Sequence, residues 1–118
     1  MKDKLMLRLP KSIQLTVQYL KEQLGDAGVI VLFGSRARGK GTDGADFDIG
    51  VTLPSGTSWK TFSVWKTKAE DLAWPYRIDL VNLTQAPQEF LEIVQKEMIV
   101  LHGVLDGRHF VTTETRRG

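Results

Sequence analysis

Two aspartates separated by one residue are the first group in this chain that could do chemistry. Asp46 and Asp48 flank Phe47 in a segment of β-forming residues, 45–53. Because side chains alternate between the two faces of a strand, both carboxylates lie on one face and Phe47 lies on the other. Their spacing along the strand is about 7 Å, so the side chains can converge on two divalent cations roughly 4 Å apart. The pair predicts a metal site.

A glycine turn before the aspartates predicts a site for phosphate. The apolar residues 29–33 end at Gly34 and Ser35, and Arg36 and Arg38 follow. Glycine at the end of a strand lets the backbone approach a ligand closely, and N–H groups left free by such a turn can bind phosphate. The two arginines add cationic donors. A phosphate site beside a metal site suits a metal-bound nucleoside triphosphate.

The glycine turn and the paired acids together resemble the signature of a known superfamily. Gly34 and Ser35, ten intervening residues and the Asp46-x-Asp48 motif are similar to the pattern of the nucleotidyltransferase superfamily that includes polymerase beta. In a chain this short, GSRARG looks like its minimal nucleotidyltransferase (MNT) branch. The resemblance covers residues 29–83 well and the flanks only in the order of helices and strands. It implies an α/β (α+β) fold with a small mixed sheet of three to four strands flanked by helices.

Asp79 is the predicted third carboxylate. It lies inside the apolar segment 76–83, where a carboxylate costs free energy unless it is paired or bound to a cation. In the resembling family a third carboxylate on the neighbouring strand completes the site, and RIDLV looks like that strand. The alternative is a structural ion pair with Arg77 or Arg36. The resemblance implies catalytic and metal-binding roles for Asp46, Asp48 and Asp79, and nucleotide-binding roles for Gly34, Ser35 and Arg36.

The resemblance also implies the reaction and the partner. Two Mg²⁺ ions, or Mn²⁺, would assist the attack of an acceptor hydroxyl on the α-phosphorus of ATP, and pyrophosphate would leave. MNT proteins are similar to the antitoxin halves of two-gene pairs, in which the partner is a HEPN ribonuclease toxin that is adenylylated on a tyrosine. We therefore expect an antitoxin that adenylylates and complexes with a HEPN toxin, in a homo- or hetero-oligomer. The loop 39–45 departs from the family pattern by its glycines and by Asp43, so nucleotide contacts there are not transferred.

Three other interpretations remain open. Residues 34–40 match the first seven positions of a P-loop, but Gly41 stands where that motif needs a hydroxyl for Mg²⁺, and the glycines that follow disfavour the long helix that a P-loop opens. The chain could instead transfer a nucleotide to a small molecule such as an aminoglycoside, although such enzymes usually carry an additional helical domain. It could also be a non-catalytic binding module that masks its partner.

Length and composition indicate how many domains the chain forms and where in the cell it is expected. A chain of 118 residues with 42% hydrophobic residues suits one domain, which we place at 1–103, with a poorly ordered extension at 104–118. Sixteen basic and 14 acidic residues give a net charge of +2, so direct nucleic-acid binding is not expected. The absence of cysteine is compatible with a reducing cytoplasm, and no apolar run suggests a signal peptide or membrane span. A cytoplasmic location is expected.

Hydrophobic periodicity predicts the elements that position the site. The expected helices cover 10–24, 58–73 and 87–97, and the expected strands cover 28–33, 45–53, 76–83 and, at an edge, 98–101. Apolar residues at helical spacing should pack on the sheet: Ile13, Val17, Leu20 and Leu24 in the first helix, Trp59, Phe62, Trp65, Ala69 and Leu72 in the second, and Phe90, Ile93 and Val94 in the third. Membrane or partner binding by the first stripe and base stacking by the second are the alternatives.

Overall fold

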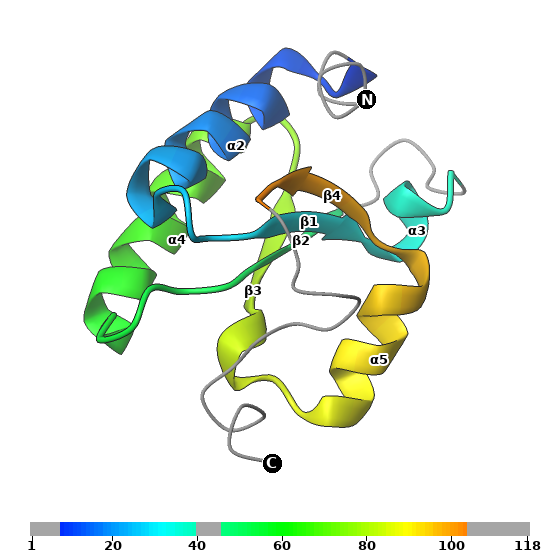
Figure 1. Ribbon diagram of the computed structural model, residues 1–118. Helices are drawn as coiled ribbons and strands as arrows, with labels where there is room; N and C mark the ends of the chain where they lie inside the picture. Colours follow the sequence, from blue (N-terminus) through cyan, green and yellow to red (C-terminus); the bar gives the residue numbers. More distant parts are fainter. Residues whose placement is uncertain (1–7, 40–45, 104–118) are drawn as a thin grey trace.

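The chain folds into a four-stranded mixed β-sheet with helices on both faces, as the computed structural model in Figure 1 shows. The structure describes residues 8–39 and 46–103. The predicted extension 104–118 and Asp43 lie outside the described residues. The sheet confirms the predicted fold class, and its fourth strand is the expected edge strand.

The strand order places the strand of the paired aspartates inside the sheet. The strands are β1 (Ile30–Phe33), β2 (Phe47–Val51), β3 (Ile78–Asn82) and β4 (Ile99–His102), in the order β3-β2-β1-β4. β1 pairs antiparallel with β2 and β4, whereas β2 and β3 run parallel. The predicted strands β1, β2 and β3 are present but shorter at their ends, because apolar alternation continues beyond the last residues that pair with a neighbour. The sheet therefore holds β2 between β1 and β3.

The helices divide between the two faces of the sheet. In Figure 1, α2 (Lys11–Leu24) and α4 (Trp59–Ala73) cover one face, α5 (Gln88–Glu97) lies on the other, and α3 (Gly34–Ala37) follows β1 at one end. A short 3₁₀ turn, η1 (Leu83–Gln85), follows β3. Among the described residues, no helix combines the length and apolar character needed to cross a membrane. The site must be built where α3 and the strand ends meet.

Local signals explain where the long helices begin and end. Pro10 precedes α2 as its N-cap and is not its first residue, one position earlier than predicted. Gly25 ends α2 as predicted, and its N–H donates to the Lys21 carbonyl at 3.0 Å. Ser58 caps α4 by accepting a hydrogen bond from the Thr61 N–H at 3.1 Å.

Two clusters of buried side chains hold the layers together. Under α2 and α4 the cluster includes Ile13, Val17, Leu20, Leu24, Ile30, Leu32, Phe47, Ile49, Val51, Ala69, Ala73, Ile78, Leu80 and Leu101. Under α5 it consists of Val29, Val31, Phe33, Leu83, Leu91 and Val94. The Thr16 hydroxyl lies 3.2 Å from the Ala69 carbonyl, and the Ser12 hydroxyl donates to the Ala73 carbonyl at 2.9 Å, so α2 and α4 are also joined by polar contacts. The predicted stripe of α2 packs on the sheet.

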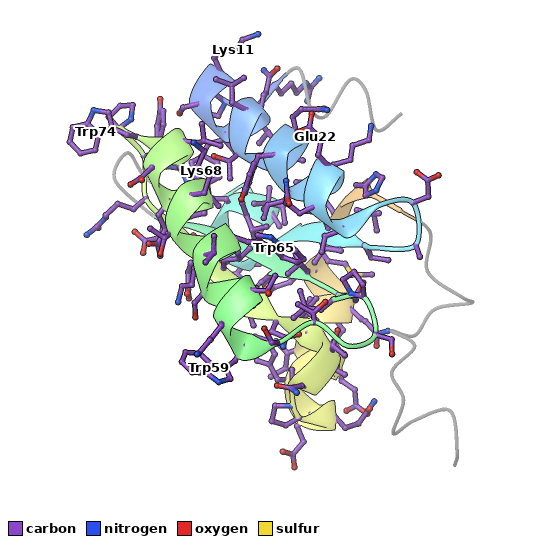
Figure 2. All side chains as sticks on the ribbon, turned by 90° about the vertical axis from the view of Figure 1, so that its left-hand side faces the viewer. Lys11, Glu22, Trp59, Trp65, Lys68 and Trp74 are labelled. Carbon is purple, nitrogen blue, oxygen red and sulfur yellow. The ribbon has the colours of Figure 1, made fainter. Side chains whose placement is uncertain are left out.

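One aromatic residue of the stripe predicted on α4 is not in the core. Trp59 is 74% exposed, whereas Phe62 and Trp65 pack against the cluster and Ala69 is buried. Trp59 is the first residue of α4, and Figure 2 shows its ring projecting from that end of the helix. The reason is that Trp59 lies ten residues before Ala69, which turns it about 80° away from the buried side of the helix. The prediction of a buried Trp59 was wrong.

The predicted inward face of α5 is also partly wrong. Ile93 is 57% exposed, and Leu91 is buried in its place. Leu91 and Val94 are three residues apart and share one side of the helix, whereas Ile93 is two residues from Leu91 and faces away from it. Phe90 packs against the cluster as predicted, with its ring centroid 5.7 Å from that of Phe33.

The exposure of Trp59 predicts how two truncations will differ in stability. Replacing Trp59 by Ala should change the free energy of unfolding by at most about 0.5 kcal/mol, because little of the side chain is removed from water. Replacing Leu20, which is 1% exposed, by Ala should lower it by about 2–5 kcal/mol because a cavity remains. Urea unfolding followed by circular dichroism measures both. Equal losses would contradict the exposed position of Trp59.

Candidate functional site

Pairing between the parallel strands brings two of the predicted acids together. Asp48 lies in β2 directly opposite Asp79 in β3. Residues that are paired in this way in parallel strands place their side chains side by side on one face of the sheet. This is the face that α5 covers, since Phe47 and Ile49 lie under α2 and α4. The structure therefore places the Asp48 and Asp79 carboxylates next to each other although 30 residues separate them in the chain.

The same register corrects the reason that singled out Asp79. The prediction assumed that its carboxylate was buried in an apolar strand, yet Asp79 is exposed and its neighbours Ile78 and Leu80 are buried. Side chains alternate between the faces of β3, so Ile78 and Leu80 enter the cluster under α2 and α4 while Asp79 points to the other face. Arg77 pairs with Asp46 rather than with Asp79. What distinguishes Asp79 is its position opposite Asp48 and not a cost of burial.

Gly34 forms the other wall of the site. It has a φ of +75°, and a Cβ built on it would lie 2.1 Å from Asp48 Oδ2. The carboxylate of Asp48 therefore rests directly against the backbone at the end of β1. No residue other than glycine permits this approach, because a side chain would occupy the position of the Asp48 oxygen. The structure thus joins the predicted glycine turn to the predicted acids.

Asp46 is held slightly apart from the other two acids. Its Oδ1 lies 3.2 Å from Arg77 Nε in an ion pair whose side chains are 43% and 77% exposed. An exposed pair of this kind contributes at most about 1 kcal/mol, so Asp46 can exchange Arg77 for another cation at small cost. Asp46 directly precedes β2 and lies two residues before Asp48, so strand alternation puts it on the same face as Asp48, where its carboxylate pairs with Arg77.

The electrostatics of the site are concentrated on Asp48. Burial raises its pKa above the ordinary value, and the nearby charges of Asp79, Asp46 and Glu97 raise it further, while Arg38 acts in the opposite direction. A raised pKa means that the charged form is disfavoured where it stands. Three neighbouring carboxylates therefore create a place where a cation would be stabilised.

The two arginines that follow Gly34 lie on different sides of the sheet end. The Arg36 guanidinium lies 4.1 Å from the centroid of the Phe47 ring, on the face that carries α2 and α4. There it lines a cavity of about 300 Å³ together with Arg8 and Leu101. Glu97 connects Arg38 to Gly34. Arg38 Nη1 lies 2.5 Å from Glu97 Oε1, and Glu97 Oε2 accepts a hydrogen bond from the Gly34 N–H at 2.7 Å.

Glu97 is a residue of this site that the sequence did not reveal. It is 63 residues from Gly34 in the chain, and only the arrival of α5 beside α3 brings the two together. One weak signal was present, because an acidic residue in the last turn of a helix is unfavourable with respect to the helix dipole and suggests a partner elsewhere. That partner is the Gly34 turn.

The donor set suits a divalent metal ion, although its members are not yet gathered around one point. Among residues 8–39 and 46–103, no three His, Cys, Asp or Glu side chains lie closely enough to hold a metal ion, and Asp46 is paired with Arg77. Carboxylate oxygens are nonetheless the ligands that Mg²⁺ prefers, and the mutual repulsion that raises the pKa of Asp48 is what a bound cation would remove. The residues present therefore fit such an ion.

Comparison with known proteins assigns the chain to a family. The family model described as polymerase beta nucleotidyltransferase matches residues 14–103. The chain belongs to this family. The match includes the glycine turn and the three aspartates, so this chain is a nucleotidyltransferase, as the resemblance implied. No curated protein matches the chain.

Solved structures with the same fold are minimal nucleotidyltransferases and antitoxins. A toxin–antitoxin crystal structure with AMP-PNP has a TM-score of 0.68 at 21% identity and covers 84% of this nucleotidyltransferase and 78% of that chain. A structure of tri-AMPylated Shewanella oneidensis HEPN toxin in complex with MNT antitoxin has a TM-score of 0.60 at 22% identity. It covers 79% of this chain and 71% of that chain. A structure named for a minimal nucleotidyltransferase has a TM-score of 0.60 at 24% identity and covers 83% of this chain and 93% of that chain. At these identities the likeness establishes the fold.

Proposed function

We propose that this nucleotidyltransferase transfers AMP from ATP to a tyrosine hydroxyl of a HEPN-family toxin and thereby acts as its antitoxin in the cytoplasm. The single observation that carries the proposal is the position of Asp48, which lies opposite Asp79 and against the Gly34 backbone. Fold neighbours with AMP-PNP and with an AMPylated HEPN toxin supply the nucleotide and the partner.

The proposed roles follow from the chemistry of each group. Asp46, Asp48 and Asp79 would hold two Mg²⁺ ions, for which Mn²⁺ could substitute. When bound, these ions neutralise phosphate charge and lower the pKa of the acceptor hydroxyl. Asp79 accepts the proton of that hydroxyl, because its carboxylate is exposed at the sheet edge where an acceptor can approach.

The phosphate groups are assigned to the turn after β1. The N–H groups of Gly34 and Ser35 and the Ser35 hydroxyl donate to the β- and γ-phosphates. Arg36 joins them by leaving the ring of Phe47. The acceptor oxygen forms a bond to the α-phosphorus, the bond from the α-phosphorus to the bridging oxygen breaks, and pyrophosphate leaves with that electron pair.

Transfer of label from ATP tests the proposal. The full chain is incubated with Mg²⁺ and the HEPN protein encoded by the adjacent gene, once with ATP labelled at the α-phosphate and once with ATP labelled at the γ-phosphate. We expect the toxin to become labelled only from the α-position, because AMP is transferred and pyrophosphate is not. Mass spectrometry should then place the added AMP on tyrosine, and toxin ribonuclease activity should fall in parallel.

The same assay separates the other two interpretations. Label on an aminoglycoside and none on the toxin would favour a small-molecule transferase. Loss of toxin activity without any label, retained when Asp46 and Asp48 are both replaced by Ala, would favour a module that only masks its partner. Either result would overturn the proposed transfer to protein.

A further inference from the structure

Glu97 already occupies the hydrogen-bond donors at the end of β1. Its Oε2 accepts from the Gly34 N–H at 2.7 Å, and its Oε1 lies 2.5 Å from Arg38 Nη1. The side chain of Glu97 is 17% exposed and that of Arg38 is 46% exposed. One internal carboxylate thus binds a backbone N–H and a guanidinium together, which is how proteins bind external anions.

A phosphate group could not use these donors while Glu97 holds them. The Gly34 N–H has one hydrogen, and at 2.7 Å it is fully committed to Oε2. A phosphate at the same place would also be repelled by the negative charge of Glu97. This carboxylate contacts the Gly34 N–H and Arg38 directly, which the three aspartates do not do in the contacts described above. Phosphate and Glu97 are therefore alternatives at this position.

The fold allows Glu97 to leave without a change in the backbone. Glu97 is the last residue of α5, where Leu91 and Val94 are buried, and β4 begins two residues later with Ile99 paired to Leu32. These contacts fix the main chain on both sides. The side chain, by contrast, has three rotatable bonds and reaches solvent. Rotation of one side chain is enough to exchange the internal anion for an external one.

We propose that Glu97 is a displaceable internal anion that competes with nucleotide phosphate for the Gly34 N–H and Arg38. This inference rests on the proposed function in that it places phosphate at the Gly34 turn. It adds that Arg38 is a phosphate ligand once Glu97 has moved, and that Glu97 lowers the affinity of the site for triphosphate. A purely structural Glu97 would have the opposite effect, since its loss would loosen the turn that binds phosphate.

Replacement of Glu97 by Gln tests the sign of this effect. The full-length variant is titrated by calorimetry with inorganic tripolyphosphate and with ATP and Mg²⁺. Loss of the competing charge should tighten binding of both at least about tenfold, the size of one charge-assisted hydrogen bond. Glu92→Gln is the matched control, because Glu92 is exposed on the same helix and its Oε2 accepts a hydrogen bond from Gln88 Nε2 at 3.4 Å. Its affinity should equal that of the natural chain.

A measurement on the unaltered chain covers the case in which the variant does not fold. In NMR spectra of labelled protein, the Glu97 carboxyl resonance and the Gly34 amide should both shift as tripolyphosphate saturates the site. Unchanged Glu97 signals at saturation, equal or weaker binding by Glu97→Gln, or no binding of tripolyphosphate to either protein would each overturn the inference. Tighter tripolyphosphate binding without any transfer of AMP would support it and refute the proposed function instead.

Discussion

Asp48→Asn should greatly slow nucleotide transfer and at the same time raise the thermal stability of the protein. Activity should fall on the order of 1,000-fold, because Asn removes the charge that neighbours both Asp79 and the Gly34 turn. Stability should rise because burial and the charges of Asp79, Asp46 and Glu97 raise the pKa of Asp48 and so disfavour its charged form in the folded state. The loss of activity and the gain in stability would both come from removing the charge of the Asp48 carboxylate.

The sign of the stability effect depends on pH in a defined way. A carboxyl whose pKa is raised on folding destabilises the folded state when it is ionised, that is, at pH values above its folded pKa. As pH falls toward and below the ordinary value of 3.8, Asp48 is protonated in both states and the penalty disappears. The variant should therefore exceed the natural chain in Tm at pH 7 and match it near pH 3.5. Thermal scans in metal-free buffer measure this difference.

Asp26→Asn provides the control for that comparison. Asp26 is exposed in the turn after α2 and lies outside the site, so its replacement should leave transfer unchanged and should not reproduce the gain in Tm at neutral pH. A fall in Tm for Asp48→Asn at pH 7 would contradict the electrostatic account. Retained transfer would contradict the assignment of Asp48 to the reaction.

The elements of the fold were predictable because their signals are local. The stripe of α2 from Ile13 to Leu24 and the alternation around Asp48 each follow from the period of a helix or a strand. Errors arose where period alone does not say which side of a helix is covered, as at Ile93 within α5 and at Trp59 at the start of α4. Trp59 matches the spacing of its helix and is nonetheless 74% exposed, because it begins the helix and is turned away from the packed side.

The site was only partly predictable, because its members meet through tertiary contacts. Asp46 and Asp48 share a face by strand alternation, which sequence alone determines. Their position relative to Asp79 depends on the parallel register of β2 and β3, and that of Glu97 depends on how α5 returns to α3. No local sequence pattern predicts the position of Asp79 beside Asp48 or that of Glu97 beside Gly34. The sequence therefore did not reveal Glu97, nor that the Arg36 guanidinium lies over the Phe47 ring.

Gly34→Ala should be far more damaging than Gly39→Ala, although both glycines have nearly the same backbone conformation. Their φ angles are +75° and +74°, so each alanine incurs the strain of a left-handed residue, about 1–2 kcal/mol. Only at Gly34 would the new Cβ collide with Asp48, at 2.1 Å from Oδ2, whereas at Gly39 it meets no described atom within 4 Å. The difference between the variants isolates the contact between turn and carboxylate.

The collision should appear in both stability and catalysis. In Gly34→Ala, the Asp48 carboxylate must move away from the turn, so we expect transfer to fall at least about 100-fold. We also expect the free energy of unfolding to fall below that of Gly39→Ala. Gly39→Ala should retain most of its activity, since its strain lies outside the contact. Label transfer from ATP and urea unfolding measure the two effects. Equal losses would show that left-handed geometry alone requires Gly34, and the close approach of Asp48 to the turn would then have no role in the reaction.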